Sequence, residues 1–298
     1  MLKKSSLMLM VIFIIGVLAA CNSGATNENA DGQTEEQTDD TEENTENNGE
    51  SDESDQTEEP DAEGTEDEDV NDESEENQEP VYYIDEETAA IHPIDDADEN
   101  VVLLTIDDAP DEYALEMAET LQEKDAKAIF FVNGHFIEDE EGQKALKTIH
   151  EMGFPIGNHT YSHPVIPEIP EDEQTEEIVS LNDKIEEIIG ERPQFFRAPH
   201  GANSDHSREV VEEEGMVLMN WTYGFDYFEE YQDADKLKEA LISGEAPEID
   251  INYSLLQPGA NILMHDREWT NEALGDVIDG LREQGYVMAD PTLIETLE

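Results

Sequence analysis

Basic residues are scarce in this chain, whose 298 residues include 14 Lys and Arg but 79 Asp and Glu, for a formal net charge of −65. Residues 1–80 hold 26 of the acidic residues and two of the basic ones, so the remainder still has a net charge near −41. Such a charge opposes binding to nucleic acid and to anionic lipid surfaces. We interpret it as an acidic surface suited to a saline or alkaline medium outside the cell, and this charge does not indicate which reaction the protein catalyses.

Cysteine occurs once, at Cys21, so no internal disulfide can form and a secreted domain must be stabilised by its core alone. Cys21 follows Lys3, Lys4 and an apolar run over residues 7–20, a pattern typical of a secretory signal that is too short to span a bilayer comfortably. The sequence Leu-Ala-Ala-Cys ending at Cys21 resembles the lipobox of bacterial lipoproteins. We therefore predict a signal peptide at residues 1–20 and a diacylated Cys21 that anchors the protein at the extracellular face of the cell membrane. The alternatives are an uncleaved anchor or an ordinary signal peptide with an incidental cysteine.

Basic residues and any apolar period are both missing from residues 21–80, which consist mainly of Asp, Glu, Asn, Gln, Thr, Ser and Gly. Too little apolar surface is available there to offset the entropy of ordering the chain. We predict an acidic, disordered linker over residues 21–80. It would hold a single folded domain, residues 81–298, away from the membrane.

The folded part alternates between apolar runs of strand length and amphipathic segments of helix length. Residues 128–132 (AIFFV) indicate a buried strand, whereas Ile178, Leu181 and Ile185 share one face of a helix. The predicted strands cover residues 101–106, 128–132, 155–158, 194–197, 216–221, 261–264 and 286–288; the predicted helices cover 111–123, 138–152, 171–189, 204–214, 233–242 and a segment from Leu274 to Leu281. This alternation predicts an α/β fold whose parallel sheet forms a distorted, closed or nearly closed barrel.

Polar and titratable side chains follow five of the predicted strands, at the point where each strand ends. In parallel barrels the carboxyl ends of the strands meet at one face, where the chemistry takes place. We therefore expect these side chains to converge on one site: Asp107, Asp108, His159, Arg197, Asp226 and His265.

His159 and His163 are four residues apart, a spacing that would place both imidazoles on one face of a helical turn and let them bind one metal ion. One carboxylate of Asp107 and Asp108 would supply a third ligand. A site with two His and one carboxylate keeps a position open for water, which is the catalytic pattern, and the other aspartate is free to accept a proton. Taken singly, the same residues fit plainer roles, since paired acids often cap a helix and most histidines lie on a surface or in a core.

Five segments, taken in order, resemble the motifs of the polysaccharide deacetylase family, carbohydrate esterase family 4, whose shared unit is the NodB homology domain. Residues 159–163 (HTYSH) match the H-[ST]-x-x-H motif fully, and residues 263–265 (LMH) match L-x-H. Residues 105–110 (TIDDAP), 197–201 (RAPHG) and 223–227 (YGFDY) are similar to TFDDGP, R-x-P-[YF]-G and D-x-x-D-W. The resemblance covers about residues 99–290 and implies the distorted barrel of that family.

The resemblance also implies a role for each matching residue. Asp107 is expected to be the general base, held by Arg197. Asp108, His159 and His163 are expected to bind Zn²⁺ or another divalent metal such as Co²⁺. Amide hydrolysis needs a polarised carbonyl, an activated water and a proton donor for the leaving nitrogen, and these residue types supply all three.

The proton donor and the binding pocket follow from the later motifs. His265 is expected to protonate the leaving amine, with Asp226 orienting and charging it. The backbone N–H of His200 is expected to face the oxyanion, and Leu263 and Tyr227 to line the pocket for the acetyl methyl group.

Three positions depart from the family motifs. His200 stands in an aromatic position, Tyr223 replaces an acid, and Tyr227 replaces a tryptophan. Tyr227 would narrow the acetyl pocket less and add a hydroxyl, which could shift substrate preference. Tyr227 belongs to a cluster of six aromatic residues that would stack on sugar rings or pack in the core: Trp221, Tyr223, Phe225, Tyr227, Phe228 and Tyr231.

Together these features predict a lipoprotein-type peptidoglycan N-acetylglucosamine deacetylase, which removes N-acetyl groups from a cell-surface polysaccharide by metal-dependent hydrolysis. Its partners would be a cell-wall glycan and the membrane, with no nucleic acid and no evident protein partner. Alternatives within the family are a chitin-like or biofilm poly-N-acetylglucosamine substrate, or an O-acetyl ester such as acetylated xylan. The alternative outside it is a glycan-binding surface lipoprotein that has lost activity through the altered motifs.

Overall fold

The computed structural model describes residues 79–297. The predicted signal peptide, Cys21 and almost all of the acidic linker lie outside this range. Among the residues that the structure describes, no helix combines the length and the apolar character needed to cross a membrane.

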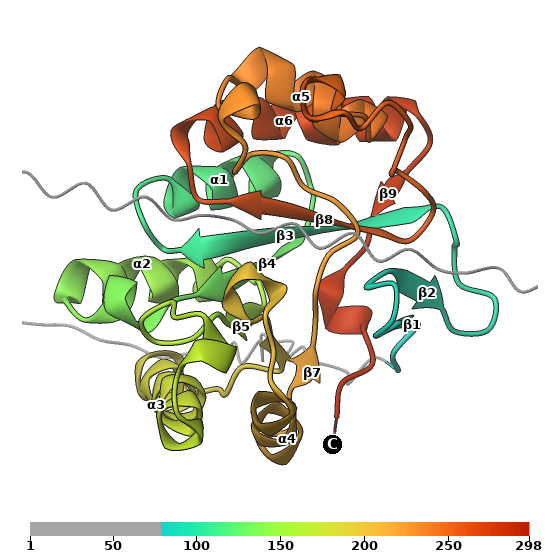
Figure 1. The fold of residues 1–298 in the computed structure, drawn as a ribbon. Helices are drawn as coiled ribbons and strands as arrows, with labels where there is room; N and C mark the ends of the chain where they lie inside the picture. The colour runs from blue at the N-terminus through green and yellow to red at the C-terminus, as the bar shows by residue number, and fades with distance from the viewer. Residues whose placement is uncertain (1–78, 298) are drawn as a thin grey trace, which may run out of the picture. The chain divides into compact units, whose positions relative to one another are not determined.

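A curled parallel sheet of seven strands forms the centre of the domain (Figure 1). Its strands pair in one order, with β9 beside the start of β3: β7 (Val217–Leu218), β6 (Phe195–Phe196), β5 (Ile156–Asn158), β4 (Ala128–Val132), β3 (Val101–Ala109) and β8 (Ala260–His265), with β9 spanning Val287–Met288. All pairs within this sheet are parallel, which confirms the predicted α/β fold.

The two outer strands of the sheet, β7 and β8, are linked by the chain that follows β7. Residues 217–218 pair with β6, and a few residues later Tyr223 forms a parallel bridge with Ile262 of β8. The N–H of Leu263 donates to the carbonyl of Tyr223 at 2.8 Å, and the N–H of Thr222 donates to that of Asn261 at 2.9 Å. The sheet is therefore nearly closed into a barrel, as predicted.

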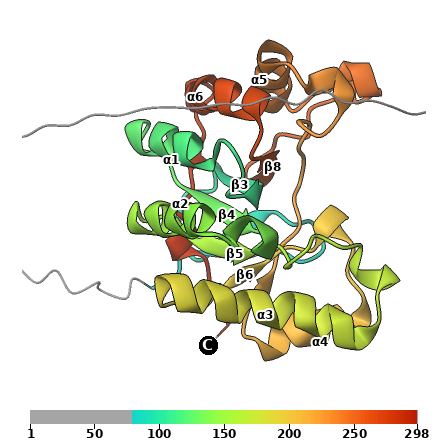
Figure 2. The same ribbon diagram turned by 90° about the vertical axis from the view of Figure 1, so that its left-hand side faces the viewer.

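Within residues 79–297, six α-helices cover the outside of the sheet: α1 (Ala114–Glu123), α2 (Glu140–Glu151), α3 (Glu171–Ile189), α4 (Asp205–Glu213), α5 (Ala234–Ser243) and α6 (Glu268–Glu283). In Figure 2, α6, α1, α2 and α3 are stacked in the same order as strands β8, β3, β4 and β5. Every predicted helix is present, and most ends agree within about three residues. Helix α3 matches exactly, because acidic residues fill its first turn and Gly190, at φ 86°, ends it in the left-handed conformation.

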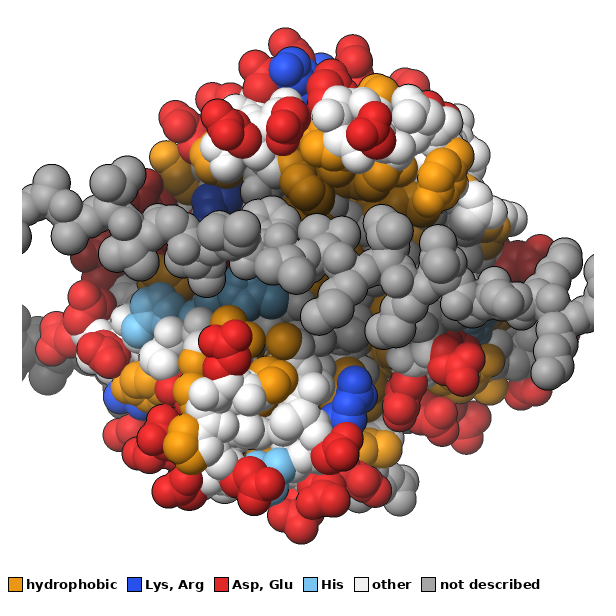
Figure 3. Space-filling view, in the orientation of Figure 1, with side chains coloured by type: hydrophobic (Ala, Val, Ile, Leu, Met, Phe, Trp, Pro, Cys, Tyr) orange, Lys and Arg blue, Asp and Glu red, His pale blue; other side chains and the backbone are white. Residues whose placement is uncertain are grey.

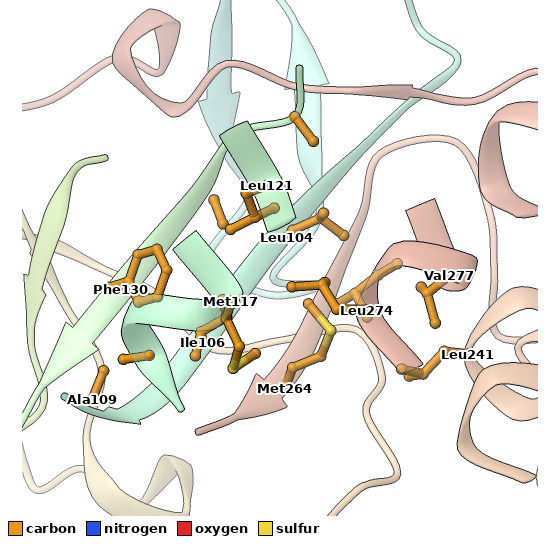
Figure 4. Close-up of a cluster of buried hydrophobic side chains, with 14 of the residues drawn as sticks. Leu104, Ile106, Ala109, Met117, Leu121, Phe130, Leu241, Met264, Leu274 and Val277 are labelled. Carbon is orange, nitrogen blue, oxygen red and sulfur yellow. The ribbon is translucent and has the colours of Figure 1, made fainter. Parts of the chain in front are cut away.

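The main core lies between the outer face of the sheet and the helices. Figure 4 shows Leu104 and Ile106 of β3 meeting Met117 of α1 and Leu274 of α6, and all four side chains are fully buried. Because side chains alternate along a strand, Leu103 and Thr105 point to the opposite, inner face. The core therefore fixes which residues of β3 face the inside of the barrel.

The inner face has an apolar layer at the start of the strands, built from Leu103, Ile129 and Phe131. A short antiparallel hairpin of β1 (Tyr82–Ile84) and β2 (Ile91–Pro93) packs against this layer. This hairpin was not predicted, since three-residue strands are too short to display a period. Apolar side chains therefore fill the barrel at the amino ends of the strands, and polar side chains occupy the other end, where the strands have their carboxyl ends.

Candidate active site

Two adjacent aspartates end β3 and reach the same site through an irregularity in the strand. Asp107 pairs with His265 of β8 and follows Leu103 and Thr105 on the inner face. Its neighbour Asp108 would face outward in a regular strand. Instead the register with β4 shifts between Ile106 and Ala109, and Asp108 has a φ of 59°. This bulge turns the second carboxylate toward the site as well.

His159 and His163 lie in a loop after β5, so the predicted helical turn is wrong. Thr160 and His163 have φ values of 69° and 61°, which a right-handed helix excludes. Side chains hold the loop in place of helical hydrogen bonds. The Nδ2 of Asn133 donates to the carbonyls of His159 at 2.6 Å and Thr160 at 3.1 Å, and Asn158 Oδ1 accepts from the N–H of Thr160 at 2.8 Å. Tertiary contacts, and not helical periodicity, bring the two imidazoles together.

Asp108, His159 and His163 offer three ligand atoms that all lie within 4.8 Å of one another. Asp108 Oδ1 is 3.4 Å from Nε2 of His163 and 3.7 Å from Nε2 of His159. The Nδ1 of His159 lies 2.7 Å from the carbonyl of Arg197, which can only accept, so Nδ1 carries the proton and Nε2 is free to bind a metal. Burial lowers the pKa of His159, which also favours the neutral ligand form. Two imidazoles and one carboxylate suit Zn²⁺ and related divalent ions, so the residues fit the expected metal.

Arg197 holds Asp107 from inside the barrel, and neither side chain is more than 3% exposed. Its Nη1 donates to Asp107 Oδ1 at 2.6 Å and to Thr105 Oγ1 at 2.9 Å, while Nε and Nη2 donate to the carbonyls of Met219 and Asn220. The guanidinium also lies 4.3 Å from the ring centroid of Phe131. Asp107 is thereby fixed through Oδ1, and Oδ2 remains directed toward His159, 3.6 Å from its Nε2.

His265 and Asp226 form the second half of the site. The Nδ1 of His265 lies 2.8 Å from Oδ1 of Asp226, whose Oδ2 accepts from the N–H of His265 at 2.6 Å and from Thr270 Oγ1 at 2.9 Å. Burial opposes protonation of His265, but the carboxylates of Asp226, Asp107 and Asp108 outweigh it and raise its pKa to about 9. His265 is therefore protonated at neutral pH, with its Nε2 available as a donor.

The two aspartates of β3, the two histidines after β5 and the pair of His265 and Asp226 all line one cavity of about 340 Å³, a size typical of small-ligand sites, whereas Arg197 lies buried behind it. Its wall includes Leu263 and Tyr227, the expected acetyl-pocket residues, and also His200. In the space-filling view of Figure 3, histidine side chains lie together left of the centre of the face, and acidic groups are most numerous around its edge. The cavity is lined by Asp107, Asp108, His159, His163, His200, Trp221, Asp226, Tyr227, Gln232, Leu263, His265, Arg267 and Trp269.

The three departures from the family motifs have different positions. His200 has a φ of 59° and its ring lies edge-on to that of His163, with 5.2 Å between centroids. Tyr227 is 47% exposed at the rim of the cavity, and its ring lies 5.8 Å from that of His265. Tyr223 is buried and its hydroxyl donates to the carbonyl of Leu241 at 2.7 Å, so this position belongs to the core. That the N–H of His200 faces the oxyanion remains a prediction.

The aromatic cluster divides between the core and the cavity. Tyr223, Phe225 and Tyr231 are at most 2% exposed and pack within the main core. Trp221 and Tyr227 line the cavity. Half of the cluster is thus core packing, one of the two outcomes that the sequence left open.

Sequence reasoning missed the residues that follow His265. Arg267 donates from Nη2 to Asp108 Oδ2 at 2.7 Å. The Nε1 of Trp269 donates to the carbonyl of Asp226 at 2.9 Å. Their position directly after a strand-end histidine was the available clue, since loops at the carboxyl ends of parallel strands build such sites.

Part of this chain matches one known protein family, and several known proteins are similar to it. Residues 95–219 match the family described as polysaccharide deacetylase. A peptidoglycan-N-acetylglucosamine deacetylase of Bacillus cereus is 32% identical over 122 residues, covering 41% of this chain and 44% of that protein. A peptidoglycan-N-acetylmuramic acid deacetylase of Bacillus subtilis is 27% identical over 191 residues, covering 63% of this chain and 68% of that protein. The chain spans about half the length of some of the curated relatives that it matches.

A solved structure from Bacillus anthracis, described as a pseudoenzyme of carbohydrate esterase family 4, has a TM-score of 0.57 and 29% identity, covering 65% of this chain and 64% of that chain. A mutant of that protein is described as having restored enzymatic activity. The matches agree with the curled sheet, the order of the motifs and the convergence of their residues on one cavity. The chain therefore belongs to the polysaccharide deacetylase family, carbohydrate esterase family 4.

Proposed function

We propose that this protein removes N-acetyl groups from amino sugars of a cell-surface polysaccharide by metal-dependent hydrolysis. One observation carries the proposal: a base fixed by an arginine, a set of three metal ligands and a protonated histidine all face one cavity of about 340 Å³. A divalent ion held by Asp108, His159 and His163 would polarise the amide carbonyl and lower the pKa of water.

The chain's own residues account for the proton transfers. Asp107 is held by Arg197 at Oδ1, so Oδ2 is the oxygen that accepts the proton of the attacking water. His265 pairs with Asp107 across β3 and β8, and its Nε2–H is available to protonate the amine as the C–N bond breaks. Asp226 keeps His265 charged and fixes the orientation of its ring.

The pseudoenzyme among the relatives makes activity an open question for any member of the family. In this chain the base, all three ligands, the acid and both of their partners are present and in mutual contact. We infer from this complete set that the protein is active. A glycan-binding role without catalysis is the second candidate, favoured only by the altered third and fourth motifs.

Peptidoglycan is the substrate that we favour, because two of the matched relatives are named as peptidoglycan deacetylases. An acyl anchor on Cys21 and the linker over residues 21–80 would place the domain within the wall layer, at the extracellular face of the membrane. Chitin-like chains, poly-N-acetylglucosamine and acetylated xylan are the alternatives. Muropeptides of a deletion strain should show increased acetylation, and unchanged acetylation would exclude peptidoglycan.

Acetate release by the purified protein tests the activity. We expect release from peptidoglycan with Zn²⁺ or Co²⁺, loss of release with a chelator, and a fall of about 10²- to 10⁴-fold in Asp107→Asn. A metal-loaded protein that releases acetate from none of the polymers would favour the binding role. Labelling with a radioactive fatty acid tests the anchor, since Cys21→Ser should abolish the label and release the protein from the membrane fraction.

A further inference from the structure

Arg267 is the one Lys or Arg among the described residues that line the cavity. Its Nη2 donates to Oδ2 of Asp108 at 2.7 Å. Each of the two carboxylates of β3 thus has one oxygen bound by an arginine, because Arg197 donates to Asp107 and Arg267 donates to Asp108. Arg197 serves the expected base, but Arg267 contacts an expected metal ligand, which raises the question of what it does there.

The two oxygens of Asp108 face different partners. Oδ1 points toward the ligand nitrogens, at 3.4 Å from His163 and 3.7 Å from His159. Oδ2 is occupied by the guanidinium of Arg267. A carboxylate oxygen that already accepts a strong charge-assisted hydrogen bond is a poorer ligand, so Asp108 would offer chiefly its other oxygen to a metal ion.

Arg267 is itself held by the loop that follows β8. Its Nη1 donates to the carbonyl of Asp266 at 2.7 Å and lies 3.6 Å from Oδ2 of Asp111. The buried carboxylate of Asp266 accepts from the N–H groups of Asp111, Tyr113 and Ala114 at 2.6 to 3.0 Å, which ties this loop to the start of α1. The guanidinium is therefore fixed at both ends although its side chain is 34% exposed.

We propose that Arg267 is a positioning residue that keeps Asp108 a one-oxygen ligand and offsets part of its negative charge. The proposal rests on the metal-dependent function above. A freed second oxygen would add a donor to the metal, and the missing positive charge would no longer repel it. Arg267 thus weakens metal binding and leaves the ion a stronger Lewis acid, because less ligand charge is donated to it.

Metal affinity of the purified full-length protein, measured by competition with a fluorescent Zn²⁺ chelator, tests this role directly. We expect Arg267→Gln to bind Zn²⁺ more tightly, on the order of tenfold, because a positive charge near the ion is removed, while acetate release by the loaded variant falls by about tenfold. Arg267→Lys retains a charge and a donor for Oδ2, so its affinity should stay within about threefold of the original protein. Arg282→Gln is the matched control, because Arg282 lies on α6 and donates to the carbonyls of Lys124 and Asp125, away from the site.

Visible absorption of bound Co²⁺ gives a second readout that does not depend on activity. The absorption weakens as coordination number rises, so Arg267→Gln should show weaker bands than the original protein and the Arg282→Gln control. Unchanged or weaker Zn²⁺ binding in Arg267→Gln with an unchanged Co²⁺ spectrum would overturn the proposal, as would equal tightening in Arg267→Lys. An original protein that binds no metal at all would instead overturn the metal-dependent function, and this inference with it.

Discussion

The pair of His265 and Asp226 gives the sharpest test of the catalytic reasoning, through the variant Asp226→Asn. The pKa of His265 is raised to about 9 from an ordinary value of 6.5, and Asp226 is the strongest of the charges that raise it. A shift of this size corresponds to about 3 kcal/mol of interaction with the protonated imidazole. Removing the charge of Asp226 should lower the pKa of His265 from about 9 toward its ordinary value of 6.5, because burial lowers it and only Asp107 and Asp108 would still raise it. A metal on Asp108 would reduce both values, since Asp108 also raises the pKa.

The magnitude follows from the fraction of protonated His265. At pH 8 a group with a pKa of about 9 is about 90% protonated, whereas one with a pKa of about 6.5 is about 3% protonated. We therefore expect Asp226→Asn to lower kcat/KM at pH 8 by up to about 30-fold from protonation alone, the limit reached if the pKa returns to its ordinary value, and by less at pH 6. The alkaline limb of the pH profile should move from near 9 toward lower pH.

The same shift predicts how stability depends on pH. The pKa of His265 is higher in the folded than in the unfolded state, so its contribution is fully present below about pH 6.5 and is lost as pH rises through about 9. Denaturant unfolding at pH 6 and pH 10 should thus show a larger difference between the original protein and Asp226→Asn at pH 6. Asp235→Asn, at an exposed carboxylate on α5, is the control and should leave the profile unchanged. An alkaline limb that stays in place in Asp226→Asn would refute the assignment of His265 as the acid.

Three further changes test the ligand set, the core and the fourth motif. His163→Gln should weaken Zn²⁺ binding by at least about 100-fold, measured by chelator competition, and affinity close to the original would remove His163 from the ligand set. Leu104→Ala should lower the free energy of unfolding by about 2–5 kcal/mol in urea, because Leu104 is fully buried between β3 and the helices; a loss below 1 kcal/mol would contradict this packing. Tyr223→Phe should lower the free energy of unfolding by about 1 kcal/mol, because it removes the hydrogen bond to the carbonyl of Leu241, and should leave acetate release unchanged. A large loss of acetate release at unchanged stability would show that Tyr223 acts in the site.

Local signals in the sequence were enough to locate most of the helices and strands. Helix α3 was predicted to the residue, because its apolar face, its acidic first turn and Gly190 all lie within the segment itself. The strand at residues 128–132 was equally clear, since five consecutive apolar residues are buried on both faces. The hairpin of β1 and β2 was missed because neither strand is stable alone, and it is held by hydrogen bonds to Gly259, just before β8, and to the C-terminal segment.

The sequence by itself determined which residues end the strands of a parallel sheet, and this was sufficient to predict that Asp107, His159 and His265 would meet. It could not determine how they are oriented. The bulge at Asp108 depends on the register between β3 and β4, and the loop of His163 depends on side chains from other strands. The contact of Arg267 with Asp108 joins residues 159 positions apart. Tertiary structure alone decides such features, because they are stabilised by groups that are distant in the chain and leave no pattern in the local sequence.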